Sequence, residues 1–165
     1  MELSGSAEMT PCPIGSFSPS TSSVSEENCT LSAPGYFTLP DGSFSPCQPG
    51  TFQPDAGMTE CLPANPGYYV EMSASPFQTP ANISYFTVGN SSTTQLSCPT
   101  GYSSIMNASV SCDFAAPGFY HDSNGSSVNA CHEGEYQPEI GSTSCIPAEK
   151  GFFVELSGSA EMTPC

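Results

Sequence analysis

Small, glycine and aromatic residues recur along the chain at intervals of about seventeen residues. Counted from a first position that is always Cys, Ala or Ser, the fourth position is Gly in every unit except one, where Ser84 takes its place. The sixth position is aromatic in all units but one, and the eleventh is small wherever the units can be aligned. Nine units therefore follow one another, with their first positions at Cys12, Ser32, Cys47, Ala64, Ala81, Cys98, Ala115, Cys131 and Ala148.

Each unit has the features of a short β-hairpin. Gly at the fourth position, often after Pro, fits a turn whose third residue has a positive φ. A short extended run then carries the aromatic residue, and the small eleventh residue marks a second turn. Seventeen residues with two turns favour a hairpin over a helix. The pattern predicts a small, disulfide-rich, all-β protein in the form of an elongated rod of stacked hairpin-like units.

The aromatic residues are the candidate core. One hairpin is too small to bury its aromatic side chain, but stacked neighbours could bury their rings together. We therefore expect a continuous aromatic column along the rod. Tyr102 joins it from the fifth position, because the unit that begins at Cys98 has Ser103 at the sixth. The expected members are Phe17, Phe37, Phe52, Tyr69, Phe86, Tyr102, Tyr120, Tyr136 and Phe153.

One eleven-residue segment occurs twice. Residues 2–12 and residues 155–165 both read ELSGSAEMTPC, and the distance of 153 residues between them contains the nine units. We expect a parent protein that repeats a 153-residue block, in which residues 1–11 end one block, residues 12–164 form the nine units and residue 165 begins the next. The first residues do not resemble a signal peptide, which favours a segment of a longer precursor.

The nine cysteines come and go in pairs within units. Four units carry Cys at the first position and again near the end, whereas the five units that begin with Ser or Ala carry neither. The simplest explanation is one disulfide within each of the four, worth about 3 kcal/mol for a loop of this size. Cys165 would pair into the next block. The expected pairs are Cys12 with Cys29, Cys47 with Cys61, Cys98 with Cys112, and Cys131 with Cys145.

The amino-acid composition predicts an extracellular protein. A net charge of −15, with 17 Pro and 15 Gly among 165 residues, would favour disorder if the repeat were absent. Regular columns and many cysteines favour a secreted disulfide scaffold instead. One basic residue against 16 acidic ones argues against a nucleic-acid partner. No stretch is long and apolar enough for a membrane segment. We expect an extracellular or cell-surface protein.

Five Asn-X-Ser/Thr sequons are candidate glycosylation sites. Three of them share the tenth position of successive units, beside the small eleventh residue. The alternative explanation is that Asn is favoured in turns and that Ser and Thr are abundant here. The sequon asparagines are Asn28, Asn82, Asn90, Asn107 and Asn124.

Residues for catalysis or metal binding are sparse. The sequence has no Ser-His-Asp arrangement and no phosphate-binding glycine loop. The two histidines, His121 and His132, lack a cluster of further ligands. We therefore expect no enzymatic activity, no cofactor and no metal site.

Two runs resemble the ephrin-receptor-like cysteine-rich repeat of extracellular proteins. They extend from Cys47 to Cys61 and from Cys131 to Cys145, and each contains the family's G-x-[FY] step. The family's C-x-x-C doublet is incomplete here, since Ala replaces its second cysteine at Ala64, Ala115 and Ala148. The resemblance implies an elongated, small β module in an extracellular setting, and no single activity.

These observations predict a structural role. A block that repeats head to tail is what an extended rod requires. We expect a component of a long glycosylated extracellular filament, or of a cell-surface or flagellar appendage. Its partner would be another copy of itself, through head-to-tail continuation with lateral association as a further option. The alternative is the stalk of a receptor or adhesin that positions a separate ligand-binding head.

Overall fold

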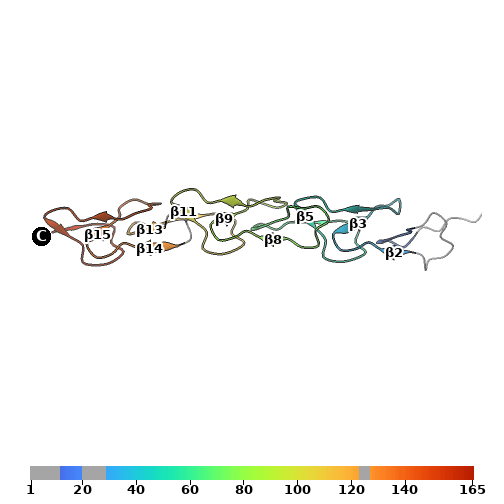
Figure 1. The fold of residues 1–165 in the computed structure, drawn as a ribbon, viewed down its shortest axis with the longest axis horizontal. Helices are drawn as coiled ribbons and strands as arrows, with labels where there is room; N and C mark the ends of the chain where they lie inside the picture. The colour runs from blue at the N-terminus through green and yellow to red at the C-terminus, as the bar shows by residue number, and fades with distance from the viewer. Residues whose placement is uncertain (1–11, 20–28, 123–126) are drawn as a thin grey trace, which may run out of the picture.

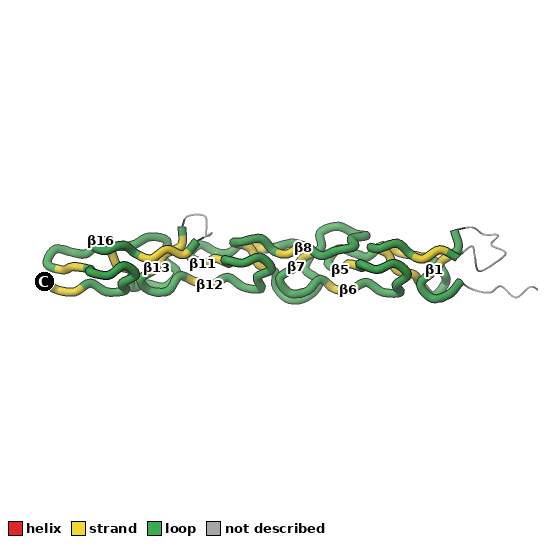
Figure 2. The backbone as a smooth tube through the Cα atoms, turned by 90° about the horizontal axis from the view of Figure 1, so that it is seen from below, coloured by secondary structure: helices red, strands yellow, loops and turns green. Residues whose placement is uncertain are grey.

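A computed structural model describes residues 12–19, 29–122 and 127–165 of the chain. The chain runs as a narrow rod, with early units toward one end and the C-terminus at the other (Figure 1). The secondary structure of these ranges is short β-strands joined by turns, which dominate the backbone in Figure 2. Within the described ranges there is no helix that could cross a membrane.

Within the described residues, nine two-stranded antiparallel hairpins follow one another, one in each unit. This confirms the predicted fold class, an elongated, disulfide-rich, all-β rod of short hairpins. The pairs are β1 (Ser16–Phe17) with β2 (Thr30–Leu31), β3 (Tyr36–Thr38) with β4 (Phe44–Pro46), β5 (Thr51–Phe52) with β6 (Leu62–Pro63), β7 (Tyr68–Tyr69) with β8 (Thr79–Pro80), β9 (Tyr85–Phe86) with β10 (Leu96–Ser97), β11 (Tyr102–Ser103) with β12 (Asp113–Phe114), β13 (Phe119–His121) with β14 (Val128–Ala130), β15 (Glu135–Tyr136) with β16 (Ile146–Pro147), and β17 (Phe152–Phe153) with β18 (Thr163–Pro164).

A tight turn opens every hairpin. In the third unit the N–H of Thr51 donates to the carbonyl of Gln48 at 3.0 Å, and Gly50 has a φ of 85°. The fifth residue donates to the second in the same way in all nine units. The positive φ explains why Gly recurs at the fourth position, since a side chain there is strained. Ser84, the exception, has a φ of 67°.

The buried residues of the rod are small or polar. Among the described residues, the buried hydrophobic side chains are only Ala, Cys and Val. They belong to the first and seventh positions of the units, and Gly at the fourth position lies between them. The seventh position also buries polar side chains of several kinds. Its buried members are Thr38, Gln53, Val70, Thr87, Ser104, His121, Gln137 and Val154.

The structure differs from the expected aromatic column. The nine aromatic side chains are half-buried or exposed, and no ring contact joins two of them within the described residues. Each instead lies opposite a residue of its own hairpin: Phe52 is paired with Leu62, and Phe86 with Leu96. Neighbouring side chains alternate between the two faces of a strand. The sixth position therefore faces outward when the seventh faces the inside of the rod.

Candidate assembly interface

Backbone hydrogen bonds join each unit to the next. The N–H of the seventh residue donates to the carbonyl of the twelfth residue one unit further on, as Gln53 does to Ser75 at 3.1 Å. From the third unit on, the described eleventh residues donate back to the first residue of the preceding unit, as Ala74 does to Cys47 at 2.8 Å. In the second unit Gly42 donates instead to Leu39 of its own hairpin, at 3.0 Å. These bonds recur with different side chains. The interface is thus built mainly from main-chain groups.

The fourth position adds a third bond of this kind. The N–H of Gly50 donates to the carbonyl of Val70 at 2.8 Å, and that of Gly134 to the carbonyl of Val154 at 2.9 Å. In the fourth unit Gly67 donates instead to the hydroxyl of Thr87, at 2.8 Å. A seventh-position side chain can therefore take over the acceptor role of the main chain.

Six units also contact the unit two places further on. The Cα of Gly67 lies against the carbonyl of Ala108, so close that an added Cβ would be within 3.0 Å of its oxygen. Real Cβ atoms do not approach so closely, and the recurring geometry fits a Cα–H···O contact. Six fourth-position glycines make this contact with the eleventh residue two units on. They are Gly15, Gly35, Gly50, Gly67, Gly101 and Gly118.

The eleventh position has a left-handed backbone. Its φ is positive whether the residue is Gly or not: 73° at Gly57, 58° at Ala74, 60° at Ser91 and 60° at Ala108. This conformation turns its N–H toward the preceding unit and leaves its carbonyl beside the glycine two units back. A bulky side chain would be strained at such a φ, which explains the small residues seen in the sequence.

Two glutamines at the seventh position brace the loop of their own unit. Gln53 donates from Nε2 to the carbonyl of Glu60 at 2.8 Å and accepts from the N–H of Asp55 at 3.1 Å. Gln137 makes the equivalent pair with Ser144 and Glu139. A buried amide is stable here because both its ends are hydrogen-bonded. Val70 and Val154 occupy the same position without these bonds.

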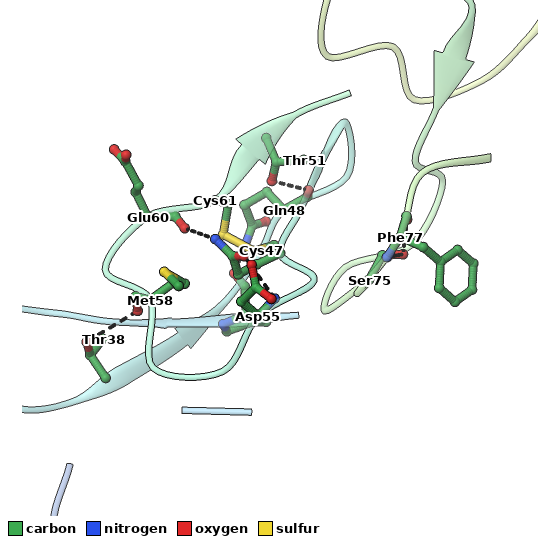
Figure 3. Close-up of a disulfide and its surroundings, with 12 residues drawn as sticks. Thr38, Cys47, Gln48, Thr51, Asp55, Met58, Glu60, Cys61, Ser75 and Phe77 are labelled. Carbon is green, nitrogen blue, oxygen red and sulfur yellow. Dashed lines mark hydrogen bonds between the residues drawn. A yellow bond between two sulfur atoms is a disulfide. The ribbon is translucent and has the colours of Figure 1, made fainter. Parts of the chain in front are cut away.

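Four disulfides lie within single units. They join Cys12 to Cys29, Cys47 to Cys61, Cys98 to Cys112, and Cys131 to Cys145, with Cα separations of 5.7 or 5.8 Å. Figure 3 shows the Cys47–Cys61 bond, with the Thr38–Met58 contact to the preceding unit nearby. Cys165 is free and exposed in this chain. Each bond ties the first position of a unit, which is buried at Cys47 and Cys131, to the residue that precedes its returning strand.

Units without cysteine use a hydrogen bond at the same place. Gln78 stands fourteen residues after Ala64, as Cys61 stands after Cys47, and its Oε1 accepts from the N–H of Asn65 at 2.7 Å. In the next unit Gln95 accepts from the N–H of Asn82 at 2.8 Å. Two units therefore replace the disulfide with a side-chain clasp. This clasp was not predicted above, although Gln at the cysteine spacing is a signal present in the sequence.

The sequon asparagines at residues 82, 90 and 107 are exposed. Asn28 and Asn124 lie outside the described residues. The hydroxyl residue of two sequons has a structural role, since Ser109 donates to the carbonyl of Met106 at 2.7 Å and Ser92 to that of Val88 at 3.3 Å. Ser142, in a unit without a sequon, donates to Glu139 at 3.1 Å. Loop geometry thus accounts for the serines, but not for the asparagines.

His121 is the largest fully buried side chain among the described residues, and neither ring nitrogen has a hydrogen-bond partner. It occupies the seventh position, where other units have Ser, Thr, Gln or Val. His132 is exposed. No group of three or more His, Cys, Asp or Glu side chains within the described ranges could hold a metal ion.

Ser84 interrupts the series of fourth-position glycines. Its counterpart two units on is Gly125, which is outside the described residues. A pocket of about 490 Å³ adjoins Ser84, and its lining includes Tyr85, Tyr102 and Asp122. The backbone bonds of the joint are nevertheless kept at this unit, since the N–H of Ser84 donates to the carbonyl of Ser104 at 2.9 Å.

Asp41 braces the tip of the β3–β4 hairpin. Its Oδ1 accepts from the hydroxyl of Ser43 at 2.6 Å and from the N–H of Ser43 at 2.9 Å. The hydroxyl bond first, and then the backbone bond, lower the pKa of this carboxyl below its usual value of 3.8.

The chain shares limited sequence identity with segments of two longer proteins. No model of a known protein family matches it. It is similar to a segment of the Mus musculus protein "Signal peptide, CUB and EGF-like domain-containing protein 2", with 27% identity over 98% of this chain and 14% of that protein. The Homo sapiens protein of the same name is 28% identical over 82% of this chain and 11% of its own length. The chain thus spans about a seventh or less of these relatives. Together with the four disulfides, the likeness indicates an extracellular, cysteine-rich repeat module.

Proposed function

We propose that the chain is a structural segment of a long extracellular filament, such as a cell-surface or flagellar appendage. The observation that carries this proposal is a double contact along the rod: hydrogen bonds join neighbouring units, and six fourth-position glycines also contact the second neighbour. Such contacts let further units stack along one axis without forming a closed ring, so the rod can be extended. A block that repeats after 153 residues extends the same geometry.

The charge and the sequons of the surface suit a filament that stays soluble and does not aggregate with other filaments. A net charge of −15 favours repulsion between rods. The exposed sequon asparagines, Asn82, Asn90 and Asn107, would carry glycans in the secretory pathway. The charge and the sugars together would protect exposed apolar side chains such as Met72 and Met106.

The chain acts without catalysis in this proposal. Its recurring contacts are backbone bonds, disulfides and side-chain clasps, all of which maintain shape. The partner is the same protein, and no cofactor or nucleic acid is required.

Imaging of the native material tests the proposal. Regular fibres with an axial repeat equal to nine units are expected by electron microscopy. Enzymatic deglycosylation should lower the mass by several sugars and leave the fibre repeat unchanged. Isolated short particles, with a distinct domain at one end, would contradict the filament.

The alternative is a stalk that positions a ligand-binding head. It is supported by the resemblance to the ephrin-receptor-like repeat and by the names of the two relatives, which include CUB and EGF-like domains. The full gene separates the two functions. Many consecutive blocks favour the filament, whereas a membrane helix and an unrelated head domain favour the stalk.

A further inference from the structure

The middle of the rod carries no charged side chain. Residues 72–112 contain no Asp, Glu, Lys, Arg or His, whereas 16 acidic residues and one basic residue lie in the rest of the chain. Glu71 and Asp113 border this stretch, and the next longest run without such residues, 9–25, has 17 residues. The stretch contains β8, β9, β10 and β11, and it lies in the middle of Figure 1. We call residues 72–112 the uncharged belt.

The uncharged belt is rich in exposed apolar side chains. Seven large hydrophobic side chains of the described residues are at least 63% exposed, and five of them belong to the belt. Apolar surface of this kind marks an interaction site or promotes aggregation. Repulsion between exposed charges is screened within about 8 Å at physiological ionic strength, so the acidic residues outside the belt protect its centre least. The five side chains are Met72, Phe77, Val88, Ile105 and Met106.

Three sequons lie in the belt, each close to an exposed apolar side chain. N-linked glycans are bulky and solubilising, so a glycan at each sequon would stand beside apolar surface that has no charge to protect it. The three asparagines are themselves exposed. The neighbours in the sequence are Asn82 with Ile83, Asn90 with Val88, and Asn107 with Met106.

Turn chemistry does not explain the asparagines at the tenth position. Asn and Asp are favoured in turns because their side chains bond to nearby backbone groups. Asp41, at the tenth position of the second unit, makes such a bond, since its Oδ1 accepts from the N–H of Ser43 at 2.9 Å. Asn90 and Asn107 occupy the same position, but their side chains make no hydrogen bond within the described part of the chain. Their amide groups are therefore available for a glycan.

We infer that N-linked glycans on Asn82, Asn90 and Asn107 cover the uncharged belt and replace the charge that keeps the rest of the rod apart from other rods. The inference rests on the glycosylated extracellular chain of the proposed function and deepens it. The three glycans hold off a second copy where electrostatic repulsion is weakest. Without them, the belt of one copy binds the belt of another through the exposed apolar side chains.

Sedimentation velocity of the secreted chain tests this inference. Every sample carries Cys165→Ser, which prevents dimers linked by the free cysteine. Protein made in eukaryotic cells should carry sugar at the three belt sequons, as shown by peptide mass spectrometry, and should be monomeric. The variant with Asn82→Gln, Asn90→Gln and Asn107→Gln should associate, with a rise of about twofold in weight-average mass, as for a pair of rods. A monomeric triple variant, or the absence of sugar from these sites, would overturn the inference.

The two sequons outside the belt provide the matched control. Asn28 follows Glu27, and Asn124 lies two residues after Asp122, so acidic residues are close to both in the sequence. The variant with Asn28→Gln and Asn124→Gln should remain monomeric. Equal association of this variant and the triple variant would contradict a special role of the belt.

Charge added to the belt should substitute for the glycans. Val88→Glu and Ile105→Glu place carboxylates on two of its most exposed apolar positions, and they should keep the triple variant monomeric. Persistent association would assign the contact to another surface and overturn the inference. If the triple variant is not secreted, the folded wild-type protein, trimmed to one sugar per site by an endoglycosidase, should associate in its place, and trimmed protein that stays monomeric would be equally contrary.

The outcome is separable from that of fibre imaging. Glycans whose removal leaves the chain monomeric overturn the inference and leave the filament intact. Short particles with a distinct head overturn the filament, whereas association of the triple variant would still support the glycan cover of the belt.

Discussion

The Cα of Gly67 rests on the carbonyl oxygen of Ala108, two units further along the chain. The same relationship links Gly35 to Ala74 and Gly50 to Ser91. It requires two unusual conformations together: a glycine with positive φ at the fourth position and a left-handed small residue at the eleventh. The rod is therefore stabilised by close backbone packing between units, and not by large apolar side chains.

Substitution of Gly67 by Ala should be strongly destabilising. The left-handed backbone penalises any Cβ by about 1–2 kcal/mol. The new Cβ would also clash with the carbonyl of Ala108, and the two units must separate to relieve this clash. We therefore expect the total loss of unfolding free energy to exceed about 3 kcal/mol. Urea unfolding, followed by circular dichroism, measures this loss.

Gly151→Ala is the matched control for Gly67→Ala. Gly151 has a φ of 89° but open space around it, so only the backbone penalty applies, about 1–2 kcal/mol. Equal losses of stability for the two variants would show that the contact between second neighbours contributes nothing.

Ala74→Gly should stabilise the rod, although it removes a side chain. Ala74 has a φ of 58°, and relief of its left-handed strain outweighs the added entropy of the unfolded chain. We expect a gain of about 0.5–1 kcal/mol in the free energy of unfolding. The same change at the buried Ala64 should instead cost about 1 kcal/mol. A loss of stability in both variants would argue against strain at the eleventh position.

Ala64→Cys combined with Gln78→Cys should introduce a fifth disulfide. These residues occupy the places of Cys47 and Cys61, whose Cα atoms are 5.7 Å apart. The new bond should add up to about 3 kcal/mol of stability under oxidising conditions. Gln78→Ala should lose about 1 kcal/mol through the hydrogen bond to Asn65. Two free thiols in the double variant, detected by a thiol reagent, would contradict the equivalence of the two positions.

Mass spectrometry of a non-reduced digest should find the cysteines linked within units. The expected linked peptides contain Cys47 with Cys61 and Cys131 with Cys145. Each bond closes a short loop, so reduction should lower the unfolding midpoint of the rod. Peptides linked between different units would contradict this arrangement.

Asp41 should titrate below the ordinary range of an aspartate, because Ser43 donates two hydrogen bonds to its carboxylate. Because the pKa of Asp41 is lower in the folded state than in the unfolded state, its carboxylate stabilises the fold. The stabilisation is complete at pH values above the unfolded-state pKa. This contribution is lost as the pH falls through the folded pKa. Carbon-13 NMR titration of the carboxyl measures the effect. Ser43→Ala should raise the pKa, and an unchanged value would contradict this role of the hydroxyl.

Much of the architecture was visible in the order of the residues. The spacing of Gly50, Phe52 and Gly57 predicted two turns and a hairpin, because positive φ restricts those positions to small residues in any surroundings. The joint presence or absence of two cysteines predicted a bond within the unit. Local conformation and short disulfide loops depend on residues that are close in the sequence, so they can be predicted from the sequence pattern.

The packing between units depended on groups that leave no sequence pattern. Backbone carbonyls receive Gly67 and its equivalents, and every residue has a carbonyl. The buried seventh position contains Val70, Thr87 and His121, which share no chemical class. Units approach one another mainly by their backbones, and the ring contact between different units within the described residues is that of Phe17 with Phe44. Which side of each hairpin faced inward was therefore settled by contacts between distant parts of the chain.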